Sequence, residues 1–181
     1  MKLLTIGCVG AVAALAAGCA PSGTADSAGS SAGAAAASAE VRDAAGQGKA
    51  RVQARQVGDA VRVRVEATGM AVGTYAAHVH TTGVCAPPDF TSAGPHWNPT
   101  NQQHGKDNPA GMHKGDLPNL TIGANGRGSI EYAIPAASIR GGATPMLDGD
   151  GAALVIHAQA DDYRTDPSGN AGARVACGVF G

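Results

Sequence analysis

Five of the six histidines lie within one stretch of the chain, from His78 to His113, and the sixth is His157. Histidine is the commonest metal ligand among the side chains. His78 and His80 are two residues apart in the apolar run GTYAAHVH. On a β-strand, positions two apart point to the same face. A strand over this run would hold two imidazoles side by side, which predicts a metal site.

A second group of candidate ligands lies in the segment GPHWNPTNQQHGKDNPAGMHKGD, which is rich in Gly, Pro and Asn and lacks helical or strand periodicity. Loops of this length without secondary structure are usually functional or disordered, and metal ligation would order this one. His104, His113 and Asp116 with one further histidine make three imidazoles and a carboxylate, which suits tetrahedral Zn²⁺. A set made only of imidazoles suits Cu²⁺.

The elements that must position these ligands are predicted to be short strands. AVRVRVEATGM alternates Val61, Val63 and Val65 with charged residues, which predicts a half-buried antiparallel strand. ARVQARQV, before the turn at Gly58-Asp59, is its predicted hairpin partner.

Five further strands are predicted from apolar, β-branched runs, and Asn125-Gly126 between two of them is a hairpin turn signal. Short strands with Gly-rich turns predict an all-β sandwich or closed barrel. The domain would begin near Ala50 and contain about 130 residues, enough for one domain. The further strands are expected over residues 73–80, 120–124, 128–134, 152–160 and 173–179.

The N-terminal region is predicted to be an export signal followed by a tether. Residues 1–18 combine Lys2 with a short apolar run that is too short for a stable membrane span. Cys19 follows Ala-Gly, which resembles the lipobox of bacterial lipoproteins and predicts cleavage before a lipidated Cys19; ordinary secretory cleavage is the alternative. Residues 19–49 are nearly all Ala, Ser and Gly in their first part, and we expect a flexible linker without a stable element.

From Gly73 onward, most of the chain resembles bacterial copper/zinc superoxide dismutases. The resemblance implies a Greek-key antiparallel β-sandwich or flattened barrel with long metal-binding and charged loops. It also implies an enzyme that converts superoxide to dioxygen and hydrogen peroxide. The matching segments, in the order and spacing of the family, are HVHTTGVC (78–85), AGPHWNP (93–99), HGKDNPAGMHKGDLPNL (104–120), VIHAQADD (155–162) and GNAGARVACGV (169–179).

The resemblance also implies which residues bind each metal, with one histidine shared between the two sets. An imidazole can bridge two metals because it has two ring nitrogens, once its ring proton is lost. The implied copper ligands are His78, His80, His96 and His157, and the implied zinc ligands are His96, His104, His113 and Asp116.

Two further residues match supporting positions of the family. Asp161 matches an aspartate that accepts hydrogen bonds from one copper ligand and one zinc ligand, here His78 and His104. Arg174 matches an arginine beside the open copper position, where its permanent charge attracts the anionic substrate. The charged loop over residues 162–172 is shorter than in eukaryotic relatives, and Arg164 is its only other cation, so the strength of electrostatic steering is left open.

The cysteine count is compatible with one disulfide. Cys8 would leave with the signal and Cys19 would carry lipid, so Cys85 and Cys177 remain. In an oxidising compartment these two are predicted to pair. Two buried free thiols are the alternative.

The net charge and the candidate metal ligands limit the functions that the chain can have. A net charge of −1 gives no bulk attraction to nucleic acid or to an anionic membrane, so membrane contact is expected only through the lipid anchor, in the periplasm or cell envelope. A non-catalytic copper/zinc-binding or copper-buffering protein is the alternative function. A copper-only enzyme is disfavoured by His104, His113 and Asp116. The oligomeric state, monomer or homodimer, is left open.

Overall fold

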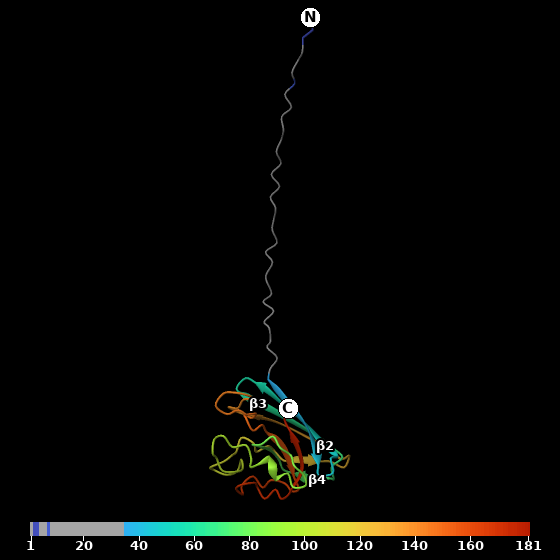
Figure 1. Cartoon of the computed structure of the whole chain (residues 1–181), viewed down its shortest axis with the longest axis vertical. Helices are drawn as coiled ribbons and strands as arrows, with labels where there is room; N and C mark the ends of the chain where they lie inside the picture. The colour runs from blue at the N-terminus through green and yellow to red at the C-terminus, as the bar shows by residue number, and fades with distance from the viewer. Residues whose placement is uncertain (1, 4–6, 8–34) are drawn as a thin grey trace. The chain divides into compact units, whose positions relative to one another are not determined.

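The structure is a computed structural model that describes residues 2–3, 7 and 35–181 (Figure 1). The chain divides into two units, residues 1–31 and 32–181, and every described strand belongs to the second. The predicted export signal falls largely outside the described residues, and Cys19 falls wholly outside them. Within the described residues, no helix has the length and apolar character needed to cross a membrane.

The regular secondary structure in the described part of the chain is almost entirely β-strand, which confirms the all-β prediction. Two long loops, residues 81–119 and 158–173, connect strands and contain most of the predicted ligands. The elements are β1 (Ala36–Asp43), β2 (Gly48–Val57), β3 (Ala60–Thr68), β4 (Gly73–Tyr75), β5 (Ala77–His80), the 3-10 helix η1 (Thr91–Ala93), β6 (Leu120–Ile122), β7 (Arg127–Ile134), β8 (Ala153–His157) and β9 (Arg174–Val179).

Seven strands form one antiparallel sheet in the order β5-β8-β9-β1-β2-β3-β7, and β4 pairs with β6 in a second, two-stranded sheet. β1 lies beside β9, and β5 beside β8, so strands distant in the sequence are neighbours, as in a Greek key. Figure 1 shows the large sheet strongly curled, with the long loops gathered on one side of the domain. This arrangement is an open barrel whose loops carry the candidate site.

The core lies inside the curled sheet and is built from small and β-branched side chains. Val61, Val63 and Val65 of β3 are almost completely buried, and their charged neighbours face solvent, as predicted. β3 pairs with β2 in register from Ala50↔Ala67 to Val57↔Ala60, which confirms the hairpin. Burying each valine side chain stabilises the fold by about 1.5–3 kcal/mol, so this strand contributes much of the core's stability.

Three expectations about the elements are wrong in detail. The predicted linker over residues 19–49 contains β1 and the start of β2, and Ala37, Ala39 and Val41 of β1 are buried. The turn at Asn125-Gly126 forms, but it joins β6 of the small sheet to β7 of the large one, so it closes no two-stranded hairpin. The single strand expected over residues 73–80 is divided into β4 and β5, which belong to different sheets.

Cys85 and Cys177 form a disulfide, as predicted, with a Cα–Cα distance of 5.7 Å. Cys177 on β9 is buried and packs in a small apolar cluster with Phe90 and Ala93 of the loop that follows β5. The disulfide therefore ties the first part of the 81–119 loop to the sheet.

Replacing Cys85 and Cys177 together by serine is expected to lower the free energy of unfolding by about 4–5 kcal/mol. The physical reason is that the crosslink closes a long loop, since the cysteines are 92 residues apart. Urea unfolding of the double variant and of disulfide-bonded wild type measures the change, and wild type in reductant, which should resemble the variant, is the control. A loss below about 1 kcal/mol would mean that this crosslink adds little to stability.

Candidate metal centre

The first three imidazoles come from two adjacent strands. His78 and His80 project from one face of β5 and are fully buried, while Val79 between them faces the core. His157 ends β8, the strand paired with β5, at an irregularity in the ladder between β8 and β9. The ring centroid of His157 lies 4.9 Å from that of His78 and 5.6 Å from that of His80. The sheet therefore fixes three rings around one point.

His96 lies between two groups of histidines. An isolated bridge joins it to His80 at the end of β5, which brings the loop onto the sheet. Its ring centroid is 4.0 Å from that of His78 on one side and 5.2 Å from that of His104 on the other. One imidazole can therefore offer a nitrogen to each group, as the family resemblance implied.

The second group has the dimensions of a tetrahedral zinc site. From Asp116 Oδ1, the Nδ1 atoms of His96, His104 and His113 lie at 2.9, 3.1 and 3.2 Å. The Nδ1 atoms of His96 and His113 are 3.4 Å apart. A tetrahedron with Zn–N bonds of about 2.0–2.1 Å has edges of about 3.3 Å. Three imidazoles and a carboxylate at these separations fit zinc.

The first group leaves four ring nitrogens buried without a partner among the described residues: His78 Nδ1, His80 Nε2, His96 Nε2 and His157 Nε2. Buried polar atoms without a partner are rare in proteins. These four residues offer ligand atoms within 4.8 Å of one another. Four imidazole nitrogens converging on one point fit copper.

Hydrogen bonds at the opposite ring nitrogens aim these lone pairs inward. His80 Nδ1 donates to Gly94 O at 2.8 Å, and His157 Nδ1 to Gly172 O at 3.3 Å. A backbone carbonyl can only accept, so each Nδ1 carries the proton and each Nε2 is left as a ligand atom. The protein thus selects the metal-binding tautomer of both rings.

Burial lowers the pKa of three of these imidazoles, to about 2 for His80, about 4 for His96 and about 3 for His157, and neighbouring imidazoles add to the shift. They are therefore neutral at physiological pH, the form that binds metal. For Asp116, burial favours the protonated form, but hydrogen bonds from the zinc-set histidines outweigh it and hold the pKa well below its usual range. The zinc set therefore contains a carboxylate anion.

Asp161 connects the two groups through hydrogen bonds. Its Oδ2 accepts from His78 Nε2 and its Oδ1 from His104 Nε2, both at 2.9 Å. This is the arrangement that the resemblance implied. His78, His104 and Asp161 also lie close enough together to bind a third ion, but both carboxylate oxygens already accept from the histidines, so the group is a support for the ligands.

Replacing Asp161 by asparagine is expected to weaken the binding of both metals by about 10- to 100-fold, the usual effect of losing a residue that orients metal ligands. Asparagine keeps the size but loses the charge and one of the two acceptors. Competition titrations with chelators for each metal measure the change. If only one affinity fell, the carboxylate would not connect the two sites.

Two supporting residues were missed in the sequence. Asn119 donates through Nδ2 to Asp161 O at 2.9 Å and accepts from Asp161 N at 2.8 Å, which fixes the backbone of Asp161. Gly169 has a φ of +64°, and a Cβ there would lie 1.9 Å from Asp161 Oδ1. Asn119 gave no separate signal within DLPNL, whereas Gly169, in the turn-type sequence Pro-Ser-Gly-Asn, is a recognisable one.

Arg174 begins β9 and extends toward the first group. Its Nη1 donates to Phe90 O at 2.8 Å and its Nη2 to Gly94 O at 2.7 Å. Gly94 O is also the acceptor for His80 Nδ1, so one carbonyl positions both the arginine and a copper-set imidazole. A guanidinium has five N–H donors, and those not used in these two bonds remain for an anion.

Comparisons with known proteins agree with this geometry. A family described as "Copper/zinc superoxide dismutase (SODC)" matches residues 46–180. A "Superoxide dismutase [Cu-Zn]" of Caulobacter vibrioides is 40% identical over 146 residues, 79% of this chain and 84% of that protein. The "Superoxide dismutase-like protein YojM" of Bacillus subtilis is 50% identical over 104 residues, 57% of this chain and only 53% of that protein. The crystal structure of a SOD-like protein from Bacillus subtilis superposes with a TM-score of 0.74 at 37% identity, covering 78% of this chain and 96% of that one.

Proposed function

Since the chain belongs to the copper/zinc superoxide dismutase family and its ligand sets fit copper and zinc, we propose that it is a catalytic superoxide dismutase. In the proposed reaction, two superoxide anions and two protons give one dioxygen and one hydrogen peroxide. Bound copper supplies the one-electron chemistry, and bound zinc supplies positive charge. The observation that carries the proposal is Arg174, which is anchored beside the copper set by Gly94 O and keeps donors for an anion.

The residues of the chain divide the remaining work. Arg174 attracts the anion and orients it through its planar donors. His96 Nε2 lies in the copper set and can hold a proton there for the peroxide product. Asp161, the carbonyl of Gly94 and the sheet keep the rings in place, so that little reorganisation accompanies each turnover.

The alternative is a non-catalytic protein that binds or buffers the same metals. The relative YojM is named "superoxide dismutase-like", and this name is the reason to consider the alternative. Such a protein needs the ligands but not the arginine, so the retained Arg174 favours catalysis.

Metal analysis combined with a superoxide assay decides between the two. The purified protein, loaded with both metals, is expected to contain one copper and one zinc per chain and to remove superoxide at a rate proportional to its copper content. The His80→Ala variant is the matched control and should lose copper and activity together. Full metal content without dismutation would support the buffering function instead.

We further propose that the protein is exported and held at the cell envelope by lipid on Cys19, on the basis of the Ala-Gly-Cys sequence there. Cys19→Ser is expected to move the protein from the membrane fraction to the soluble fraction or to block its processing. Cys8→Ser, within the predicted signal, is the control and should change neither the fraction that contains the protein nor its processing. Mass spectrometry of the N-terminus provides the measurement, and a wild-type N-terminus without acyl mass would contradict the proposal.

A further inference from the structure

Two of the zinc-set residues have an edge at the surface, and the other two do not. His104 and Asp116 are 0% and 1% exposed, whereas His96 and His113 are 6% and 7% exposed. A cavity of about 30 Å³ also touches Asp116, but it has room for about one water molecule and is bordered by Lys106, so entry past His96 or His113 is favoured.

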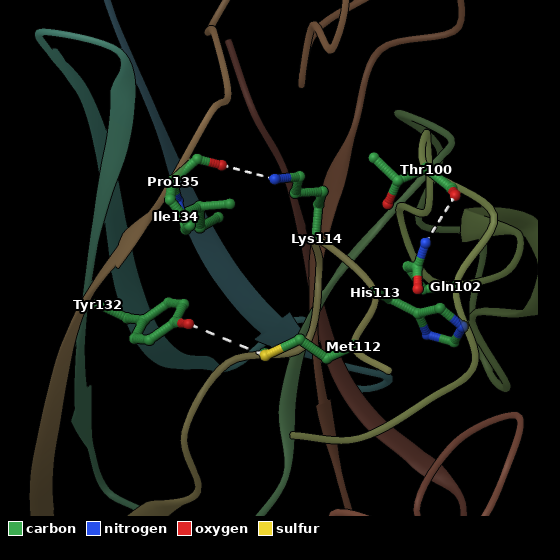
Figure 2. A pocket seen from close by; sticks show the side chains of 8 residues that line it. All are labelled: Thr100, Gln102, Met112, His113, Lys114, Tyr132, Ile134 and Pro135. Atoms are coloured by element: carbon green, nitrogen blue, oxygen red, sulfur yellow. Dashed lines mark hydrogen bonds between the residues drawn. The ribbon is translucent and has the colours of Figure 1, made fainter. Parts of the chain in front are cut away.

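Two cavities reach His113. The smaller has a volume of about 260 Å³ and is bounded by Met112, Tyr132 and Lys114 (Figure 2). The Lys114 ammonium donates to Pro135 O at 2.6 Å, which holds its positive charge at this cavity. A cation that approaches there is repelled.

The larger cavity has a volume of about 390 Å³ and reaches both His96 and His113. Among the described residues that line it, Asp148 is the one with a permanent charge. Asp148 Oδ1 accepts the backbone N–H of Asp150 at 3.0 Å within a turn, which fixes the position of the side chain. Asp148 forms no ion pair with any described residue, so its negative charge is not neutralised by a neighbour.

We propose that the larger cavity is the route by which zinc reaches its ligands, and that Asp148 attracts the cation into it. A carboxylate at the mouth of a cleft raises the local concentration of cations and their rate of entry. The cavity ends at the two zinc-set imidazoles that are not fully covered. Asp148 is not a ligand of the bound ion, so removing its charge should act mainly on the rate of entry and lower the affinity by no more than that factor.

The test is the rate of Zn²⁺ uptake by the full chain after metal removal, measured by stopped flow with a chromophoric zinc indicator. At an ionic strength of about 10 mM, Asp148→Asn is expected to slow uptake roughly three- to tenfold, near the lower end of known steering effects. Asparagine keeps the oxygen that accepts from Asp150, so the turn should be retained. The difference should shrink at about 0.5 M salt, because exposed charges are then screened within a few ångströms.

The release rate is the second measurement. Zinc loss from the fully loaded protein to a chelator should stay within about twofold of the wild-type rate, because a charge at the rim of a site changes the association rate more than the dissociation rate. Zinc loss that accelerates by more than uptake slows would instead identify Asp148 as a ligand and overturn the proposal. Neither measurement depends on superoxide dismutation.

Two variants serve as controls. Asp150→Asn makes the same change in charge two residues away, outside the residues that line the cavity, and should leave uptake near the wild-type rate. Lys114→Gln removes the cation that repels zinc at the smaller cavity, so its uptake should be no slower than that of wild type. If Lys114→Gln or Asp150→Asn slowed uptake as much as Asp148→Asn, the proposed route would be wrong.

Discussion

Replacing Arg174 by alanine is expected to lower kcat/KM for superoxide by about 10- to 100-fold while both metals stay bound. Superoxide dismutases are themselves a standard example of electrostatic steering, for which effects of 10 to 10³ are known. Arg174 is anchored through Phe90 O and Gly94 O, and no metal-set nitrogen depends on it as a partner. The loss should therefore appear in substrate capture, and a pulse radiolysis measurement on protein of known metal content detects it.

The matched variants separate charge from position. Arg174→Lys keeps the charge but loses the planar fork, so it should fall between wild type and alanine. Arg164→Ala removes an exposed cation of the preceding 158–173 loop, and Arg164 forms no hydrogen bond to the copper set. A change of less than about twofold is expected, because exposed charges are largely screened. Equal rates for wild type and Arg174→Ala at full metal content would remove this residue from the reaction.

Replacing Asp116 by asparagine is expected to lower zinc affinity by more than the roughly 100-fold that follows the loss of a merely supporting residue. Asp116 contributes the only anion of the zinc set, and its Oδ2 also accepts the backbone N–H groups of Gly105 and His113 at 2.9 and 3.0 Å. Asparagine removes the charge and weakens the ties that hold this loop. Inductively coupled plasma analysis and a chelator competition measure the change.

The consequence for the loop distinguishes Asp116 from a surface carboxylate. Proteolysis between residues 98 and 115 should become faster in Asp116→Asn even with zinc in excess, because the hydrogen bonds from Gly105 and His113 are weakened. Asp107→Asn, an exposed carboxylate of the same loop, is the control and should keep zinc. Retention of zinc at wild-type affinity by Asp116→Asn would show that the carboxylate is not a ligand.

The strands that could be predicted are those whose side chains alternate strongly. β3 has valine at three of its four inward positions and Ala67 at the fourth, so period and burial coincide. β1 was missed because its inward positions are Ala37, Ala39 and Val41, and alanine is a weak β-former whose burial depends on partners elsewhere in the chain. Residues 73–80 were predicted as one strand. A sequence period cannot show that the chain passes from one sheet to the other at Ala76.

The ligands could be predicted because their chemistry is carried by side chains, but much of their support could not. His80 and Arg174 are both positioned by the carbonyl of Gly94, and a carbonyl leaves no mark in the sequence. Asn119 acts on the backbone of Asp161, 42 residues away, and only the folded loops bring them together. The choice of ring nitrogen at each histidine likewise depends on such contacts.

The carboxylate of Asp161 makes the two ion-binding equilibria interdependent. An ion that fixes His104 also fixes Asp161, and with it the ring of His78 in the other set. Because one carboxylate holds both rings, we expect the first ion to restrict them further and the two ions to load cooperatively. By thermodynamic reciprocity, zinc would then tighten copper binding by the same factor by which copper tightens zinc binding. Chains holding a single ion are then expected to be less populated than two independent sites would give.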